Sequence, residues 1–211
     1  MQLYDFPKAP NPRRINIFLA EKGIDIPRVT VDLMQRQQLT PEYRAKNPAC
    51  DVPMLELDDG TCISQIRGIQ RYFEETHPDP PLLGSSPVQK ACVEMWDHLA
   101  AMNGLSAVAD AFRNTTPGFA DRAVVGPHGY AQIPELAERG KTRLQNFFVD
   151  FDQRLADNEY VAGDFYSVAD ITTLVTCDFA GWIKASIPDN CPHLKAWYGR
   201  VSQRPAVLAN A

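Results

Sequence analysis

The residues best placed for chemistry in this 211-residue chain lie in a short loop that leads into a predicted helix. Asn11 is a preferred N-cap residue, and Pro12 then occupies the first helical position, where its missing N–H costs nothing. Gly23 marks the helix end. Free N–H groups and the positive end of the helix dipole attract an anion. We therefore predict an anion site at the start of residues 9–24, with Asn11 as the helix cap.

A second helix start that could bind an anion is predicted at residues 65–76. Ser64 is a suitable cap, and it would leave the N–H groups of Gln65 and Ile66 free to bind a carboxylate. Val52 and Pro53 precede this helix, at the start of a predicted strand, where a proline is tolerated.

The elements that must position these residues follow from the hydrophobic pattern of the first 78 residues. A strand, a helix and a second strand within 33 residues make a βαβ unit, whose two strands are parallel. Asp58-Asp59-Gly60 then indicates a hairpin between two antiparallel strands. The predicted order is β-α-β-α-β-β-α, which matches a thioredoxin-like fold. The predicted strands are 2–6, 28–33, 51–57 and 61–63, and the predicted helices are 12–22, 41–45 and 65–76.

The rest of the chain has a helical pattern throughout. A proline-rich connector at residues 79–87 is the best domain boundary. Ser167-Val168-Ala169-Asp170 is similar to a capping box, with Asp in the Glu/Gln position. We therefore predict an α+β protein with a thioredoxin-like domain at residues 1–78 and an all-helical domain at residues 87–211. The predicted helices of the second domain are 88–114, 133–156, 167–182 and 192–203, with a loop at 115–129.

Composition excludes several functional classes. The net charge of −5 argues against nucleic-acid binding, and no apolar run has the length of a membrane span. The five cysteines form no C-x-x-C pair and the four histidines show no ligand spacing, so we expect neither disulfides nor a metal. We see no signal peptide, and we expect a cytoplasmic protein.

Four motifs in order resemble those of one family. The loop at residues 9–14 is followed by Asn47-Pro48-x-x-x-Val52-Pro53-Met54-Leu55. Ile63-Ser64-Gln65-Ile66-Arg67-Gly68-Ile69-Gln70-Arg71-Tyr72 and Tyr160-Val161-Ala162-Gly163-Asp164-Phe165-Tyr166-Ser167-Val168-Ala169-Asp170 complete the series. Together they span almost the whole chain, which resembles the cytosolic glutathione S-transferases of the bacterial type.

The resemblance implies a homodimer that binds glutathione and joins it to a small apolar electrophile, as in detoxification. It implies a cis peptide bond before Pro53, with the Val52 backbone and Pro53 holding the cysteinyl part of glutathione. Gln65 and Ile66 fall at the γ-glutamyl site, and Gln38 falls where relatives bind the glycyl carboxylate. Two departures stand out among these positions. Ala9 replaces a catalytic serine, and Ile66 replaces a serine hydroxyl, which leaves Asn11 as the nearest catalytic candidate.

Activation of the glutathione thiol requires a free energy to which Asn11 would contribute. Lowering the thiol pKa from ~8.5 to about 6.5 needs roughly 2.7 kcal/mol. A helix N-terminus contributes about 0.3–1 kcal/mol, and one charge-assisted hydrogen bond about 1.5–3 kcal/mol. Asn11 is therefore either the donor that completes this requirement or only a helix cap.

Two other functions fit the same residues. One is glutathione-dependent reduction of disulfides or peroxides, and the other is a non-catalytic module that binds ligands or partners. In the helical domain we interpret five residues as core rather than as the wall of a co-substrate pocket: Met95, Trp96, Met102, Asn103 and Phe112.

Overall fold

Four short strands form a mixed sheet in the order β2-β1-β3-β4 in the computed structural model, which describes all residues 1–211. β1 pairs in parallel with β2 and antiparallel with β3, and β3 pairs antiparallel with β4. The register places Leu3 opposite Leu55, and Leu55 opposite Ile63. The strands are β1 (Gln2–Asp5), β2 (Arg28–Thr30), β3 (Met54–Glu56) and β4 (Cys62–Ser64).

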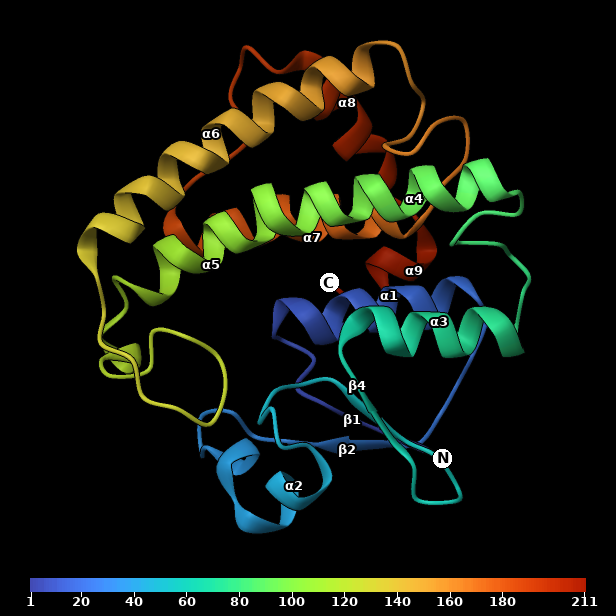
Figure 1. Cartoon of the computed structure of the whole chain (residues 1–211). Coiled ribbons are helices and arrows are strands. Elements are labelled where there is room, and N and C mark those ends of the chain that lie inside the picture. Colours follow the sequence, from blue (N-terminus) through green and yellow to red (C-terminus); the bar gives the residue numbers. More distant parts are fainter. The chain divides into compact units, whose positions relative to one another are not determined.

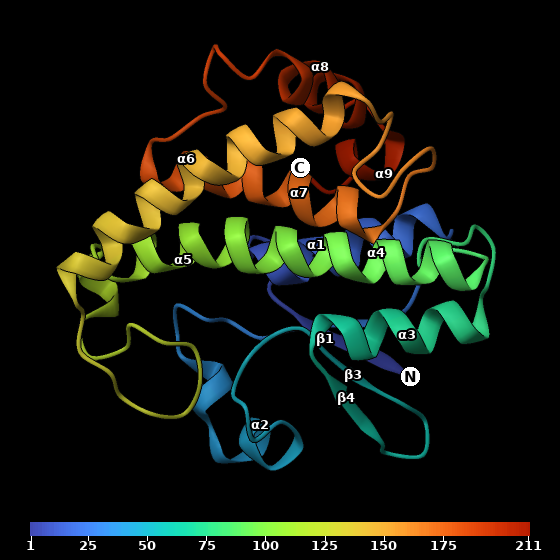
Figure 2. The same cartoon turned by 45° about the horizontal axis from the view of Figure 1, so that its top comes forward.

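Helices cover the two faces of this sheet unequally. α1 (Pro10–Glu21) and α3 (Ile66–Thr76) contact each other on one face, and the short α2 (Pro41–Lys46) lies on the other (Figures 1 and 2). Successive residues of a strand point to opposite faces. Leu3 and Leu55 are accordingly buried on one face, while Met54 packs with Tyr43 of α2 on the other.

The predicted element order β-α-β-α-β-β-α is confirmed, but β2 and β3 are shorter than predicted. β2 ends at Thr30 because the chain turns at Asp32, whose carboxylate accepts the N–H groups of Met34 and Gln35. This turn leads into a 3₁₀ segment, η1 (Gln37–Leu39), which precedes α2.

The second part of the chain is helical, as predicted, and the helix predicted at 88–114 contains a π-helical segment. α7 is buried along almost its whole length and contacts α4, the π-helical segment η2, α5 and α8. None of the helices combines the length and apolarity that crossing a bilayer demands. The elements are α4 (Pro87–Leu99), η2 (Ala100–Leu105), α5 (Ser106–Arg113), η3 (Pro117–Phe119), α6 (Pro134–Ala156), α7 (Val168–Ala180), η4 (Gly181–Ile183), α8 (Pro192–Val201) and α9 (Pro205–Leu208).

The capping box predicted before α7 is confirmed. Ser167 is the N-cap, and the buried Asp170 carboxylate accepts its backbone N–H at 3.0 Å. Asp170 also accepts the Ser167 hydroxyl, the Val161 N–H and the Trp197 indole N–H. Burial raises the pKa of Asp170 to about 6.

Contacts divide the chain into two units. The first contains Met1–Pro80, Val124–Gly129 and Asn210, and the second contains Pro81–Ala123, Tyr130–Ala209 and Ala211. Every residue predicted to bind glutathione lies in the first unit.

Candidate active site

The N-terminus of α1 differs from the prediction in its cap. The helix begins at Pro10, and Ala9 is the N-cap, so the prediction that Asn11 caps the helix is wrong. The physical reason is that the fixed φ of Pro10 suits the first helical position. Because Pro10 and Pro12 have no N–H and the Arg13 N–H donates to Ala9 O at 3.1 Å, only Asn11 offers a free backbone N–H in this turn.

The Asn11 side chain is exposed, and Arg14, one helical turn further along, sets its orientation. Its Oδ1 accepts a hydrogen bond from the Arg14 guanidinium at 3.2 Å. Its amide nitrogen therefore points away from Arg14 and makes no hydrogen bond within the chain. Asn11 thus presents a backbone donor and a side-chain donor at the positive end of α1.

The segment before β3 has an irregular backbone. The Val52–Pro53 bond is cis, as the resemblance implied, and Val52 and Pro53 are both buried. Neither backbone polar group of Val52 has a hydrogen-bond partner within the chain. A buried residue with unpaired backbone groups offers a peptide ligand a donor and an acceptor.

The N-terminus of α3 lacks the predicted cap. Ser64 belongs to β4, so the prediction that it caps α3 is wrong, and Gln65 is the N-cap at φ +70°. Ser64 is instead a strand residue, and it pairs with Met54 in the sheet. No side chain caps α3, so its first-turn N–H groups have no side-chain acceptor. Ile66, the first helical residue, is buried and has no side-chain donor.

Gln38 lies in η1 and is only 7% exposed. Its Oε1 is buried without a hydrogen-bond partner. No hydrogen bond joins Gln38 to Asn11 or to Gln65, so its role stays a prediction.

Asp51 is a residue that the sequence reading missed. Its carboxylate accepts Gln65 Nε2 at 2.6 Å and Asn47 Nδ2 at 2.8 Å. It therefore connects the segment before Pro53 to the N-terminus of α3. The one available signal was an acidic residue directly before the Val-Pro pair.

Three of the protein's five thiols are poor nucleophiles. Burial raises the pKa of the Cys62, Cys177 and Cys191 thiols, which disfavours the reactive thiolate. All five cysteines are free, and no group of three His, Cys, Asp or Glu side chains is arranged to hold a metal.

The interpretation of the helical-domain candidates as core is wrong for three of them. Met95, Met102 and Asn103 are exposed. Trp96 packs edge-on against Phe151 at 5.7 Å, and Phe112 packs against Trp182 at 5.2 Å. Phe112 therefore belongs to an aromatic cluster whose member Trp182 is half-exposed.

Comparison with known proteins indicates the same family that the sequence motifs resemble. Residues 1–75 match the glutathione S-transferase N-terminal domain, and residues 109–205 match the glutathione S-transferase C-terminal domain. Glutathione S-transferase 2 of Saccharomyces cerevisiae is 36% identical over 210 residues, which are 98% of this chain and 88% of that protein.

Two crystal structures have closely similar folds. A glutathione S-transferase domain-containing protein from Marinobacter aquaeolei is 38% identical with a TM-score of 0.91, and the match covers 98% of this chain and 100% of that one. Gtt2 from Saccharomyces cerevisiae is 35% identical with a TM-score of 0.92, and the match covers 100% of both chains.

The thioredoxin-like sheet, the helical part and these matches define an enzyme of the transferase class with glutathione as its substrate. The chain belongs to the glutathione S-transferase family. None of the comparisons favours a reductase or a non-catalytic module.

Proposed function

We propose that the enzyme activates glutathione at the N-terminus of α1, with Asn11 as the catalytic residue. The supporting observation is that Asn11 offers both an unpaired backbone N–H and an unpaired side-chain NH₂ there. Both donors stabilise the thiolate more than the thiol, and so lower the pKa of the bound thiol. The thiolate then attacks an apolar electrophile by substitution or addition.

The test is the pKa of bound glutathione, followed by its ultraviolet thiolate absorbance, in Asn11→Ala. We expect the pKa to rise by about 1–2 units, because one charge-assisted hydrogen bond is lost. Asn190→Ala is the control, since Asn190 is exposed in the second unit. An unchanged pKa and an unchanged turnover in Asn11→Ala would remove Asn11 from the mechanism.

The remaining parts of glutathione have a proposed place in residues 1–78. The Val52 backbone next to Pro53 pairs with the cysteinyl residue as an added strand would. Gln65 and the N–H groups at Ile66 bind the γ-glutamyl carboxylate, and Gln38 binds the glycyl carboxylate. Residues 87–211 contribute the pocket for the apolar electrophile.

We also propose a cytoplasmic homodimer. Val88 and Met95 lie seven residues apart on the same side of α4 and are 73% and 48% exposed. Exposed apolar side chains in line on one helix are typical of an interface. Light scattering should give twice the chain mass for the wild type, and Met95→Glu should shift the protein toward monomer.

Disulfide or peroxide reduction in the same site is the second candidate function. An Asn that stabilises the glutathione thiolate serves both reactions, since both begin with that thiolate. Parallel assays with an aryl halide, a mixed disulfide and a hydroperoxide separate the two. Conjugation should give the highest kcat/KM, and Asn11→Ala should lower all three rates together.

A further inference from the structure

The outer edge of β2 has backbone hydrogen-bonding groups without partners. β2 is the first strand in the sheet order, so only one of its sides is paired. Val31 N–H donates to Asp5 O of β1 at 2.8 Å, and in a strand every second residue turns its polar groups to the same side. Arg28 and Thr30 therefore turn theirs away from the sheet. Both residues are exposed, and neither makes a backbone hydrogen bond within the chain.

A hollow of about 420 Å³ lies beside this edge, between β2 and α2, which are neighbours in Figure 1. Its apolar walls include Val29, Val31 and Tyr43. The ring of Tyr4 also lines it and meets the Tyr43 ring edge to face, with the centroids 6.1 Å apart. The volume is within the range of ligand pockets, roughly 300–1,000 Å³. None of the residues proposed to bind glutathione lines this hollow.

The lining of the hollow has one charge that the chain does not compensate. Lys46 forms an ion pair with Glu56, and this contact lowers the pKa of Glu56 to about 2, so that the pair stays ionised and has no net charge. Glu42, in the first turn of α2, is exposed and has no ion pair. The charge of the lining is therefore complementary to a basic group on a ligand.

We propose that the β2 edge and the hollow bind an extended peptide of a partner protein, which adds to the four-stranded sheet as a fifth, antiparallel strand. Two residues of the peptide exchange backbone hydrogen bonds with Arg28 and Thr30. The residue between them lies opposite Val29, and its aromatic or large aliphatic side chain enters the hollow, because directly opposite residues share a face. A Lys or Arg two positions away lies on the same face and meets Glu42.

The probe is the peptide acetyl-Lys-Thr-Phe-Thr-Lys-amide, titrated into isotope-labelled protein by nuclear magnetic resonance. Its central Phe fills the hollow, and its two Thr residues pair with the strand. We expect saturable shifts and slowed hydrogen exchange at the amides of Arg28 and Thr30. A peptide with Ser in place of Phe should bind at least about tenfold weaker, because the burial of an aromatic side chain is lost. N-methylation of both Thr residues should also cost at least about tenfold, because the backbone donors are lost.

Two protein variants test the edge and the charge. Thr30→Pro removes the outward N–H and keeps the pairing with β1, since proline is tolerated on an edge strand where its N–H would face solvent. It should bind the peptide at least about tenfold weaker. Glu42→Gln should bind it about two- to fivefold weaker. Glu135→Gln is the matched control, because Glu135 also follows a proline in the first turn of a helix and is exposed in the second unit. It should bind like the wild type.

Three outcomes overturn the proposal. The wild type might as well lack the site if it fails to bind the peptide or binds the N-methylated peptide equally well. If Thr30→Pro does not fold, the N-methylated peptide with the wild type decides the question. An assembly of the wild type that Thr30→Pro splits into smaller particles in light scattering would mean that a second copy of this chain, rather than a partner's peptide, occupies the edge.

Discussion

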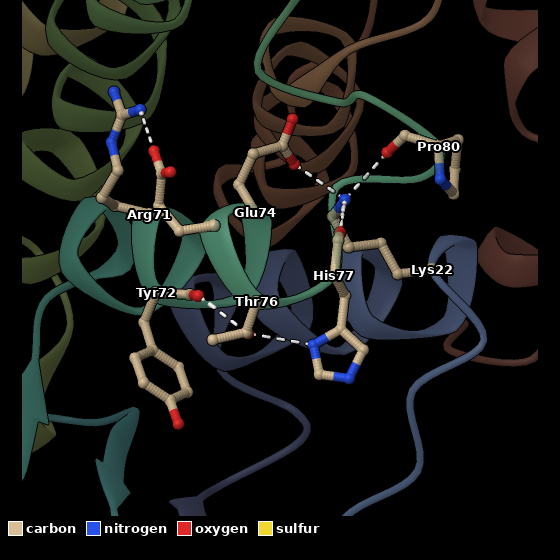
Figure 3. A network of polar contacts seen from close by, with 8 residues as sticks. Lys22, Arg71, Tyr72, Glu74, Thr76, His77 and Pro80 are labelled. Carbon is tan, nitrogen blue, oxygen red and sulfur yellow. Dashed lines mark hydrogen bonds and ion pairs between the residues drawn. The ribbon is translucent and has the colours of Figure 1, made fainter.

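Lys22 is the buried cation on which we expect the stability of the first unit to depend most. Its side chain is 0% exposed, and its ammonium group lies 2.8 Å from Glu74 Oε2, on a carboxylate that is 8% exposed. The same group donates to the carbonyl oxygens of His77 at 2.7 Å and Pro80 at 2.8 Å (Figure 3). Lys22 thus joins the end of α1 to the end of α3 and to the connector that follows.

Lys22→Met should lower the free energy of unfolding by about 3–5 kcal/mol, because it removes the ammonium group from beside a buried carboxylate and takes a hydrogen-bond donor from two carbonyl groups. Methionine fills most of the volume of the lysine stem, so the cavity cost is small. A loss of this size lowers Tm by roughly 6–20 °C in a chain of this length. Urea unfolding gives the free energy, and the melting curve gives the shift.

The control is Lys141→Met, which breaks an ion pair with Glu138 whose side chains are 49% and 73% exposed. We expect a change of at most about 1 kcal/mol there. The double variant Lys22→Met with Glu74→Leu should recover part of the loss, since the buried carboxylate that lost its lysine is removed. Equal stability of Lys22→Met and Lys141→Met would refute the reasoning.

Four further changes give distinct outcomes. Ile66→Ser should bind glutathione about tenfold tighter in calorimetry, because a hydroxyl returns to the start of α3, while losing roughly 1.5–3 kcal/mol of stability as a buried side chain is removed. The raised pKa of Asp170, about 6, means that the native state holds its proton longer than the unfolded state. The unfolding free energy of the wild type relative to Asp170→Asn should therefore fall by about 2 kcal/mol as pH rises from 4 to 6, and level off above about pH 7. Gly140→Ala should destabilise by about 1–3 kcal/mol, since its Cβ would lie 2.6 Å from Ala107 O. Gly199→Ala meets nothing within 4 Å, and helix propensity predicts a gain of about 0.5–1 kcal/mol there by urea unfolding.

The fold was predictable because local signals agree along the chain. Alternating apolar residues, Gly60 in the hairpin turn and the Ser167–Asp170 cap each predicted an element that the structure contains. The start of α1 was less predictable because Asn11 and Pro10 are both good initiators, and the choice depends on the backbone of Ala9. Contacts between residues distant in sequence were not predictable at all. Lysine usually lies on the surface, so the sequence gives no sign that Lys22 is buried. Glu74 lies next to Lys22 only in the folded chain.

The two prolines of α1 lead to the sharpest test of how the thiolate is stabilised. An ordinary helix start offers several free N–H groups, but here Pro10 and Pro12 remove theirs and Asn11 provides the one that remains. The requirement of roughly 2.7 kcal/mol exceeds the ~0.3–1 kcal/mol of an exposed helix dipole. The two Asn11 donors, at about 1.5–3 kcal/mol each for a charged acceptor, can supply the rest.

A graded pair of variants separates the two donors of Asn11. Asn11→Ala keeps the backbone N–H and loses the side-chain donor, whereas Asn11→Pro loses both at a helix position that tolerates proline. We expect the pKa of bound glutathione to rise in Asn11→Ala and to rise further in Asn11→Pro, with unchanged far-ultraviolet circular dichroism. Equal pKa values in the two variants would mean that the backbone N–H does not contact the sulfur. The thiolate would then depend on the Asn11 side chain and the helix dipole alone.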